Sequence, residues 1–213
     1  MSISATLHIL NDDEVACSVL VRLLAPSGLA SVVHGSMEIF LARYNANTPA
    51  CLLVDMLLPG WGPGRVLREL KRRGILHPAI FMTHRVEENS LTELLRLGAF
   101  AFIRKPLNQI HLLELIQEAL VEDRRRFPLL FQARQMRDRM TRLSPRERKV
   151  LELTLQGLPA REIASRLGSQ PRTVENQRLA AQNKLEISGL AATVRLLTLV
   201  EVASQLGWLG DGE

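Results

Sequence analysis

The chain has 213 residues, of which 46% are hydrophobic and 23% charged, which is typical of a soluble globular protein long enough for two domains. It has no basic N-terminal segment followed by a long apolar run, and no stretch of about 18 uncharged apolar residues, so the sequence predicts neither a signal peptide nor a membrane span. Residues 1–120 carry eleven basic and eleven acidic side chains, whereas residues 121–213 carry sixteen and eleven, so the net charge of +5 lies in the second half and indicates an anionic partner there.

Short apolar runs alternate with amphipathic segments through the first half of the chain. The predicted strands are 5–10, 31–34, 51–55, 79–83 and 99–103, and the predicted helices are 14–24, about 37–44, 66–74, 90–98 and 109–120. This alternation is typical of a doubly wound α/β fold, a parallel sheet with helices on both faces. Cys17 and Cys51 lie within the apolar patterns, which favours buried free thiols in a reducing, cytoplasmic setting.

Polar residues follow the predicted strands at the carboxyl ends, where parallel α/β sheets bind their ligands. They are Asn11, Asp12 and Asp13 after the first strand, Asp55 at the end of the third, Thr83 at the end of the fourth, and Lys105 with Pro106 after the fifth. Carboxylates crowded at one edge repel one another unless a hard cation holds them. We therefore expect Mg²⁺ and the Lys105 ammonium to balance the charge of Asp55.

Over residues 5–122 this pattern resembles the receiver domain of two-component response regulators, which implies a flavodoxin-like (βα)5 fold. The resemblance rests on the acidic cluster after the first strand, on Asp55 followed by Pro59, on Thr83 and on the Lys105–Pro106 pair. It implies that Asp55 is the phosphoryl acceptor. It also implies that Asp12 is a direct Mg²⁺ ligand and that Leu57 contributes its backbone carbonyl.

The same resemblance assigns roles to the later strands. Thr83 would bond the phosphoryl oxygens, Lys105 would pair with them, and Phe102 would be the aromatic residue that rotates inward on activation. The Lys105–Pro106 peptide bond is cis in this family. The chemistry agrees with these roles, because an aspartate nucleophile that attacks phosphorus forms an acyl phosphate while cations spread the developing charge.

The sequence departs from the receiver pattern at the predicted metal site and at its entrance. Asn11 stands where an acid that acts through water is usual, so we expect weaker Mg²⁺ binding, with Asp13 as a further candidate ligand. His84 and Arg85 follow Thr83 where small residues are common, and they crowd the entrance.

Residues 123–140 are predicted to form a helical linker between the two domains. Pro128 cannot continue an undisturbed helix, so the pattern predicts one helix to about residue 126, a kink, and a second helix over about 129–141. The apolar side chains of this segment pack either on a partner chain or on their own domain, and both alternatives stay open: Phe127, Leu130, Phe131 and Met136.

The second half predicts a small helical domain. Ser144 to Glu147 form a capping box with proline in the first turn, which begins a helix that ends at Gly157. Further helices are predicted from Pro159 to Gly168, from Pro171 to about residue 185, and from about residue 189 to about 206. Three short helices joined by tight turns indicate a helix-turn-helix, although any small bundle has a similar pattern.

The helix after Pro171 has an apolar stripe, formed by Val174, Ala181 and Leu185, and a polar face. An outer face rich in amides suits the major groove, where Asn and Gln read adenine and Arg reads guanine; a solvated polar face is the alternative. The outer face comprises Arg172, Glu175, Asn176, Leu179 and Asn183, with Gln177, Arg178, Gln182 and Lys184 on its flanks.

Residues 141–206 closely resemble the LuxR-type helix-turn-helix through an ordered set of matches that includes Glu162-Ile163-Ala164 and Thr173-Val174-Glu175. Because this helix-turn-helix follows a receiver-like domain, the whole chain resembles response regulators of the NarL/FixJ type. The resemblance implies that Thr173 and Lys184 contact DNA phosphates. It also implies that Glu175, Asn176 and Leu179 approach bases, with Gln177, in place of the usual histidine, and Arg178 beside them.

We therefore expect a receiver domain over 1–122, the linker over 123–140 and a DNA-binding domain over 141–213. The first hypothesis is a transcription factor, not an enzyme, that a sensor histidine kinase phosphorylates, that dimerises when active, and that binds double-stranded DNA, with RNA polymerase as a further candidate partner. The alternative is an atypical, phosphorylation-independent receiver that serves as a dimerisation or ligand-sensing module. A phosphatase-like or flavodoxin-like enzyme is disfavoured, because no glycine-rich phosphate loop follows the first strand.

Overall fold

The computed structural model describes residues 5–84 and 88–210, and the chain divides into two compact units. The first unit comprises Met1–Pro128 and Gly207–Glu213, and the second comprises Leu129–Leu206. Within the described part of the chain, no helix has the length and apolarity needed to cross a membrane.

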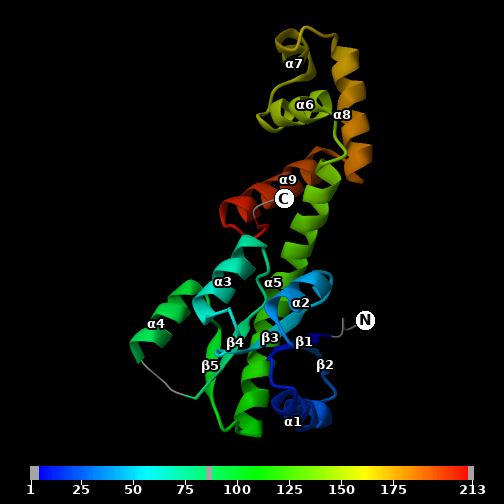
Figure 1. Cartoon of the computed structure of the whole chain (residues 1–213). Helices are drawn as coiled ribbons and strands as arrows, with labels where there is room; N and C mark the ends of the chain where they lie inside the picture. Colours follow the sequence, from blue (N-terminus) through cyan, green and yellow to red (C-terminus); the bar gives the residue numbers. More distant parts are fainter. Residues whose placement is uncertain (1–4, 85–87, 211–213) are drawn as a thin grey trace. The chain divides into compact units, whose positions relative to one another are not determined.

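Strands and helices alternate in the first unit as the sequence predicts (Figure 1). The elements are β1 (Thr6–Leu10), α1 (Glu14–Leu24), a 3₁₀ turn (Ala25–Ser27), β2 (Ala30–His34), α2 (Met37–Arg43), β3 (Ala50–Asp55), α3 (Pro63–Arg72), β4 (Ala79–Thr83), α4 (Glu88–Leu97), β5 (Ala101–Arg104) and the first part of α5 (Gln109–Met140).

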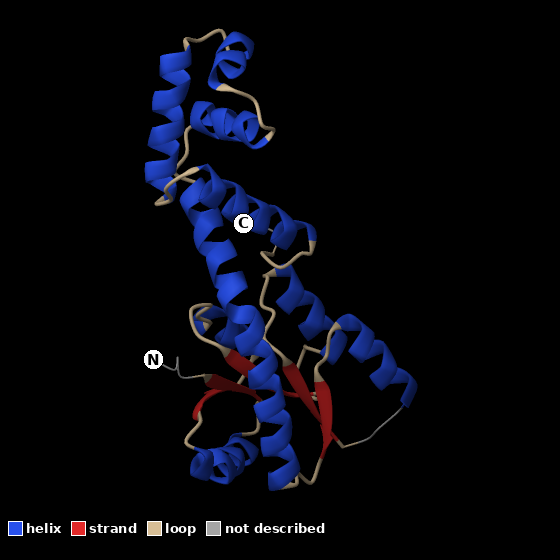
Figure 2. Cartoon of the chain, turned by 180° about the vertical axis from the view of Figure 1, so that it is seen from behind, coloured by secondary structure: helices blue, strands red, loops and turns tan. Residues whose placement is uncertain are grey.

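The five strands form one parallel sheet in the order β2-β1-β3-β4-β5, with helices on both faces, which confirms the predicted doubly wound fold (Figure 2). Side chains of a strand point alternately to its two faces. On β3, Cys51 and Leu53 pack in the core layer that α1 and α5 cover, whereas Leu52 and Val54 pack in the layer that α2, α3 and α4 cover. Because both faces are buried, β3 is apolar throughout until Asp55.

Helix α5 differs from the sequence prediction. The predicted division into two helices is wrong, because α5 is one helix from Gln109 to Met140 with Pro128 inside it. Proline removes a single i→i−4 hydrogen bond, and the bonds on either side of it are sufficient to continue the helix. Phe127, Leu130 and Met136 are buried in the single chain, so these side chains do not require a partner chain to cover them.

The second unit contains the end of α5 and the helices α6 (Pro145–Leu155), α7 (Ala160–Arg166), α8 (Pro171–Leu185) and α9 (Leu190–Gln205). The capping box at the start of α6 is present, with Ser144 bonded to the Glu147 N–H and Glu147 to the Ser144 N–H. The predicted apolar stripe of α8 is confirmed, because Val174, Ala181 and Leu185 are all buried. Val174 joins a core that α6 and α7 complete.

Candidate functional site

Asp55 lies at the carboxyl end of the central strand β3, with only 6% of its surface exposed. Its Oδ2 accepts a hydrogen bond from Lys105 Nζ at 2.5 Å, and its Oδ1 accepts one from the backbone N–H of Leu57 at 3.0 Å. A buried carboxylate is costly unless it is paired and hydrogen-bonded. Both oxygens of Asp55 have a donor, so the fold holds the charged carboxylate in one orientation.

The two neighbouring strand ends place Thr83 and Lys105 beside Asp55. In the β3–β4 register Asp55 pairs with Met82, so the 6% exposed Thr83 is the next residue along β4. The Lys105 N–H donates to the Thr83 carbonyl at 2.8 Å, and the Lys105–Pro106 peptide bond is cis, as the resemblance implies. Phe102 on β5 is half-buried and stacks on Phe81, with 6.0 Å between ring centroids.

The residues after β1 have three different environments. Asn11 is 2% exposed, and because Leu10 pairs with Val54, it lies next to Asp55 on the neighbouring strand. Asp12 is exposed at the mouth of the site. Asp13 caps α1, because its Oδ1 accepts hydrogen bonds from the N–H groups of Val15 and Ala16. One oxygen of the Asp13 carboxylate therefore caps the helix, which the sequence analysis did not predict although Asp before a helix is a common N-cap.

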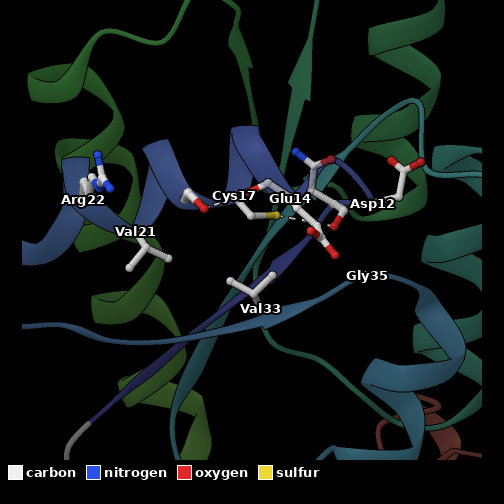
Figure 3. Close-up of a pocket in the computed structure, with 9 residues that line it drawn as sticks. Asp12, Glu14, Cys17, Val21, Arg22, Val33 and Gly35 are labelled. Carbon is white, nitrogen blue, oxygen red and sulfur yellow. Dashed lines mark hydrogen bonds between the residues drawn. The ribbon is translucent and has the colours of Figure 1, made fainter.

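A hollow of about 640 Å³ opens beside this site, between α1 and the end of β2 (Figure 3). Asp12 and Glu14 lie at the amino end of α1 and Arg22 lies toward its other end. Cys17 donates to the Asn11 carbonyl, with 3.5 Å between sulfur and oxygen. Burial raises the pKa of the Cys17 thiol, and nearby carboxylates raise it further: Asp13, Asp12, Asp55 and Glu14. Cys17 is therefore a neutral thiol at pH 7 with several carboxylates nearby.

The donor set at this edge suits Mg²⁺ better than a metal that needs many protein ligands. Among the described residues, no group of three or more His, Cys, Asp or Glu side chains is arranged to hold a metal ion. Mg²⁺ keeps several waters and needs only one or two carboxylates. Asp12 and Asp55 supply two carboxylates at this edge, so the residues present fit Mg²⁺, and Asp13 and Glu14 add negative charge nearby.

The loop after β3 is held by contacts that the sequence reasoning did not identify. Trp61 Nε1 donates to Glu38 Oε1 at 2.7 Å, and the Arg65 guanidinium lies 4.2 Å from the centroid of the Trp61 ring. Trp61 therefore links the loop beside Asp55 to α2 and α3. On the other side of the site, His84 is exposed, whereas Arg85 lies outside the described residues.

The polar face of α8 is solvent-exposed in the second unit. The side chains of Arg172, Asn176 and Asn183 are exposed and form no hydrogen bond or ion pair with another residue that the structure describes. Leu179 is 58% exposed on the same helix. The exposed set also includes Thr173, Glu175 and Lys184, whereas Gln177 and Arg178 are half-buried. An exposed helix face with unused amide and guanidinium groups matches the requirements of a major-groove reader.

Lys184 has a second role that the sequence pattern did not show. Its Nζ donates to Glu147 Oε2 at 2.7 Å, and the same oxygen accepts the N–H of Ser144 at 2.7 Å. The hydrogen bond from Lys184 and the backbone N–H of Ser144 lower the pKa of Glu147. The pair joins the end of α8 to the start of α6, across 37 residues of sequence.

Comparison with known proteins agrees with both halves of this description. The family model of the response regulator receiver domain matches residues 7–117, and the model of the luxR family of bacterial regulatory proteins matches residues 141–197. The transcriptional regulatory protein FixJ of Azorhizobium caulinodans is 32% identical over 200 residues, which cover 94% of this chain and 95% of FixJ.

Two solved structures match nearly the whole chain. The response regulator StyR is 27% identical, with a TM-score of 0.66, and the match covers 92% of this chain and 98% of StyR. Full-length FixJ from B. japonicum is 25% identical, with a TM-score of 0.54, and the match covers 94% of this chain and 99% of that one.

A doubly wound domain with an acidic strand edge, followed by a helix-turn-helix, defines a DNA-binding response regulator. The chain belongs to the NarL/FixJ family of these regulators.

Proposed function

We propose that Asp55 is phosphorylated by a sensor histidine kinase and that this modification controls dimerisation and transcription from bound DNA. The observation that carries the proposal is the geometry of Asp55, a buried carboxylate at a strand end whose two oxygens are held by Lys105 and by the Leu57 N–H. In this proposal the regulator acts in the cytoplasm, where it meets both the kinase and DNA.

In the proposed reaction, a carboxylate oxygen of Asp55 attacks the phosphorus of a phosphohistidine. The new O–P bond forms as the P–N bond breaks, and the imidazole leaves with the bonding electron pair and takes up a proton. Lys105 keeps its charge beside the acyl phosphate, and Thr83 donates its hydroxyl to a phosphoryl oxygen. Mg²⁺, held by Asp12, Asp55 and the Leu57 carbonyl, would neutralise charge on the phosphoryl oxygens when bound.

On the second unit, we infer that α8 enters the major groove. Thr173 and Lys184 contact phosphates, while Glu175, Asn176 and Leu179 approach base edges with Arg172, Gln177, Arg178 and Asn183 around them. The exposure of this face and its unused amide groups support the inference. In the active dimer, two such helices dock on half-sites about one DNA turn apart.

The first test is the intact mass of the full chain after incubation with Mg²⁺ and a small phosphodonor. We expect an increase of about 80 Da, one phosphoryl group, in the wild type and none in Asp55→Asn. Equal uptake by the Asp55→Asn variant would sink the assignment of Asp55.

A phosphorylation-independent receiver remains the second candidate, because Asn11 replaces an acid at the metal site. It predicts no mass increase with either a small donor or a phosphorylated kinase, together with unchanged DNA affinity in Asp55→Asn. An Asp55-dependent mass increase excludes it.

A further inference from the structure

The side-chain amide of Asn11 is held by one end only. The backbone N–H of Asp13 donates to Asn11 Oδ1 at 3.0 Å, which fixes which end of the amide is the oxygen. The other end, Nδ2, is buried and finds no hydrogen-bond acceptor among the described residues, although Asn11 is only 2% exposed. A buried donor without an acceptor is costly, so its persistence indicates an acceptor that arrives with a ligand.

The position of Asn11 identifies the kind of ligand. Asn11 follows Leu10, which pairs with Val54, so Asn11 and Asp55 are neighbours at the ends of two paired strands. Side chains alternate along a strand: Ile9 and Leu53 share the core layer under α1 and α5, and Asn11 and Asp55 are each two residues further on. The two side chains therefore leave the sheet on the same face, where the Lys105 ammonium also reaches Asp55.

The chemistry of an amide at this place differs from that of a carboxylate. A carboxylate repels a phosphoryl group unless a cation lies between them, whereas an N–H attracts it directly. Asn11 and Asp12 also line the hollow beside α1, so the Asn11 side chain lies between this hollow and Asp55 on the neighbouring strand.

We propose that Asn11 is a phosphoryl-binding residue, whose Nδ2 donates a hydrogen bond to a phosphoryl oxygen on Asp55 and thereby replaces part of the role of the bound cation. The proposal rests on the proposed phosphorylation of Asp55. It carries a consequence for the metal: the wild type binds Mg²⁺ weakly, and its phosphoryl site depends less on Mg²⁺ than that of an Asn11→Asp variant.

The probe is beryllium fluoride, BeF₃⁻, which stands in for the phosphoryl group on an aspartate. The ¹⁹F spectrum of the full chain reports whether BeF₃⁻ binds, and the ¹⁵N–¹H spectrum reports the Asn side-chain amides. We expect the Asn11 N–H proton, identified by its loss in Asn11→Asp, to move downfield when BeF₃⁻ binds. Asn45 is the matched control, because its Oδ1 likewise accepts from a backbone N–H two residues on, that of Asn47, in an exposed loop before β3.

Two variants measure the size of the effect. Asn11→Ala removes the donor and is expected to weaken BeF₃⁻ binding at saturating Mg²⁺ by about tenfold, the size of one hydrogen bond to an anion. Asn11→Asp is expected to bind Mg²⁺ more tightly, measured by Trp61 fluorescence in a Trp208→Phe background, and to lose BeF₃⁻ more steeply as Mg²⁺ is withdrawn. Asn45→Asp should change neither quantity.

The outcomes separate the two proposals. If neither the wild type nor Asp55→Asn gives a bound ¹⁹F signal, the proposed phosphoryl site is wrong, and the proposed role of Asn11 is wrong with it. A bound signal that leaves the Asn11 amide proton unmoved, or an Asn11→Ala variant that binds BeF₃⁻ as tightly as the wild type, overturns the role of Asn11 alone. The measurement on the wild type holds even where a variant fails to fold.

Discussion

His8 on β1 and His34 on β2 lie side by side in the core, with 3.0 Å between His8 Nδ1 and His34 Nε2. Burial, and then the positive charges that His34 and His77 would carry, lower the pKa of His8 to about 4; burial also lowers the pKa of His34. An unfolded histidine has a pKa of about 6.5. As the pH falls below about 6.5, the unfolded chain takes up protons that the folded chain does not. The free energy of unfolding therefore decreases as the pH falls from about 6.5 toward about 4.

We expect the first unit to lose about 1–2 kcal/mol of stability to His8 between pH 7 and pH 5, measured by urea unfolding with tryptophan fluorescence. His8→Val should flatten this dependence, even if its stability at pH 7 is lower. His111→Gln is the control, because His111 is exposed, and should keep the slope of the wild type. A slope in His8→Val equal to that of the wild type would assign the acid sensitivity to other groups.

Lys184 combines two roles at the residue scale. Its ammonium is held by Glu147 but is still 41% exposed, which leaves N–H groups for a DNA phosphate. Replacing a residue that contacts a phosphate weakens binding uniformly across sequences and reduces the salt slope, d log K/d log[salt], by about 1 in magnitude. We expect this result for Lys184→Met, measured by fluorescence anisotropy with a nonspecific DNA duplex.

The matched control for Lys184→Met is Lys149→Met, which removes an exposed lysine paired with Glu152 on α6 and should leave the salt slope unchanged. If Lys184→Met lowers the thermal stability and the slope stays at the wild-type value, Lys184 only braces α6 against α8.

At the scale of elements, Asp123 ties α5 to the sheet. Its Oδ2 accepts the N–H of Ala50, the first residue of β3, at 2.9 Å, and its Oδ1 accepts from His77 Nδ1 at 3.0 Å. His77 Nε2 is in turn hydrogen-bonded to the hydroxyl of Tyr44, 2.9 Å away. Asp123 is 1% exposed, so removal of its carboxylate leaves two buried donors without an acceptor.

We expect Asp123→Ala to destabilise the first unit by about 2–5 kcal/mol and Asp123→Asn by less, because an amide oxygen still accepts one of the two hydrogen bonds. Glu122→Gln is the control, since Glu122 forms a half-exposed ion pair with Arg126 and should change stability by less than about 1 kcal/mol. Urea unfolding of the three variants measures these differences. Equal midpoints for Asp123→Ala and Glu122→Gln would show that the connection contributes nothing.

The elements themselves were predictable because local patterns determine them. The sequence predicts the parallel sheet and the edge where Asp55, Thr83 and Lys105 meet, since the carboxyl ends of parallel strands lie together. It does not predict that the buried Nδ2 of Asn11 lacks an acceptor among the described residues. Nor does it predict that Asp13 Oδ1 caps α1.

Contacts between residues distant in sequence explain the remaining gaps. The link between Asp123 and Ala50 spans 73 residues and the pair of Lys184 and Glu147 spans 37, so both depend on tertiary packing that no local pattern encodes. The predicted division into two helices at Pro128 is wrong for the opposite reason. The rule that proline interrupts a helix is local, whereas the helical pattern continues on both sides of Pro128.

At the scale of the whole molecule, the proposed switch is a coupling free energy between the Asp55 site and DNA. Such coupling is reciprocal, because a ligand at one site changes the affinity of the other site by the same factor in both directions. If the modified chain binds a symmetric operator as a dimer, BeF₃⁻ must tighten DNA binding, and DNA must tighten BeF₃⁻ binding equally. The exposed Leu95 and Leu97 on α4 are candidates for the receiver–receiver contact.

We expect a factor of about 5–150 in each direction, typical of allosteric coupling, for the full chain with a duplex selected from a random-sequence pool. Anisotropy with and without BeF₃⁻ measures one direction, and ¹⁹F titration with and without the duplex measures the other. The DNA affinity of Asp55→Asn, whatever its value, should stay the same when BeF₃⁻ is added. Equal DNA affinity with and without BeF₃⁻ in the wild type, despite a bound ¹⁹F signal, would mean that phosphorylation does not act through DNA affinity. Two unequal factors would instead show that the two measurements follow different oligomeric states, which sedimentation at each concentration would identify.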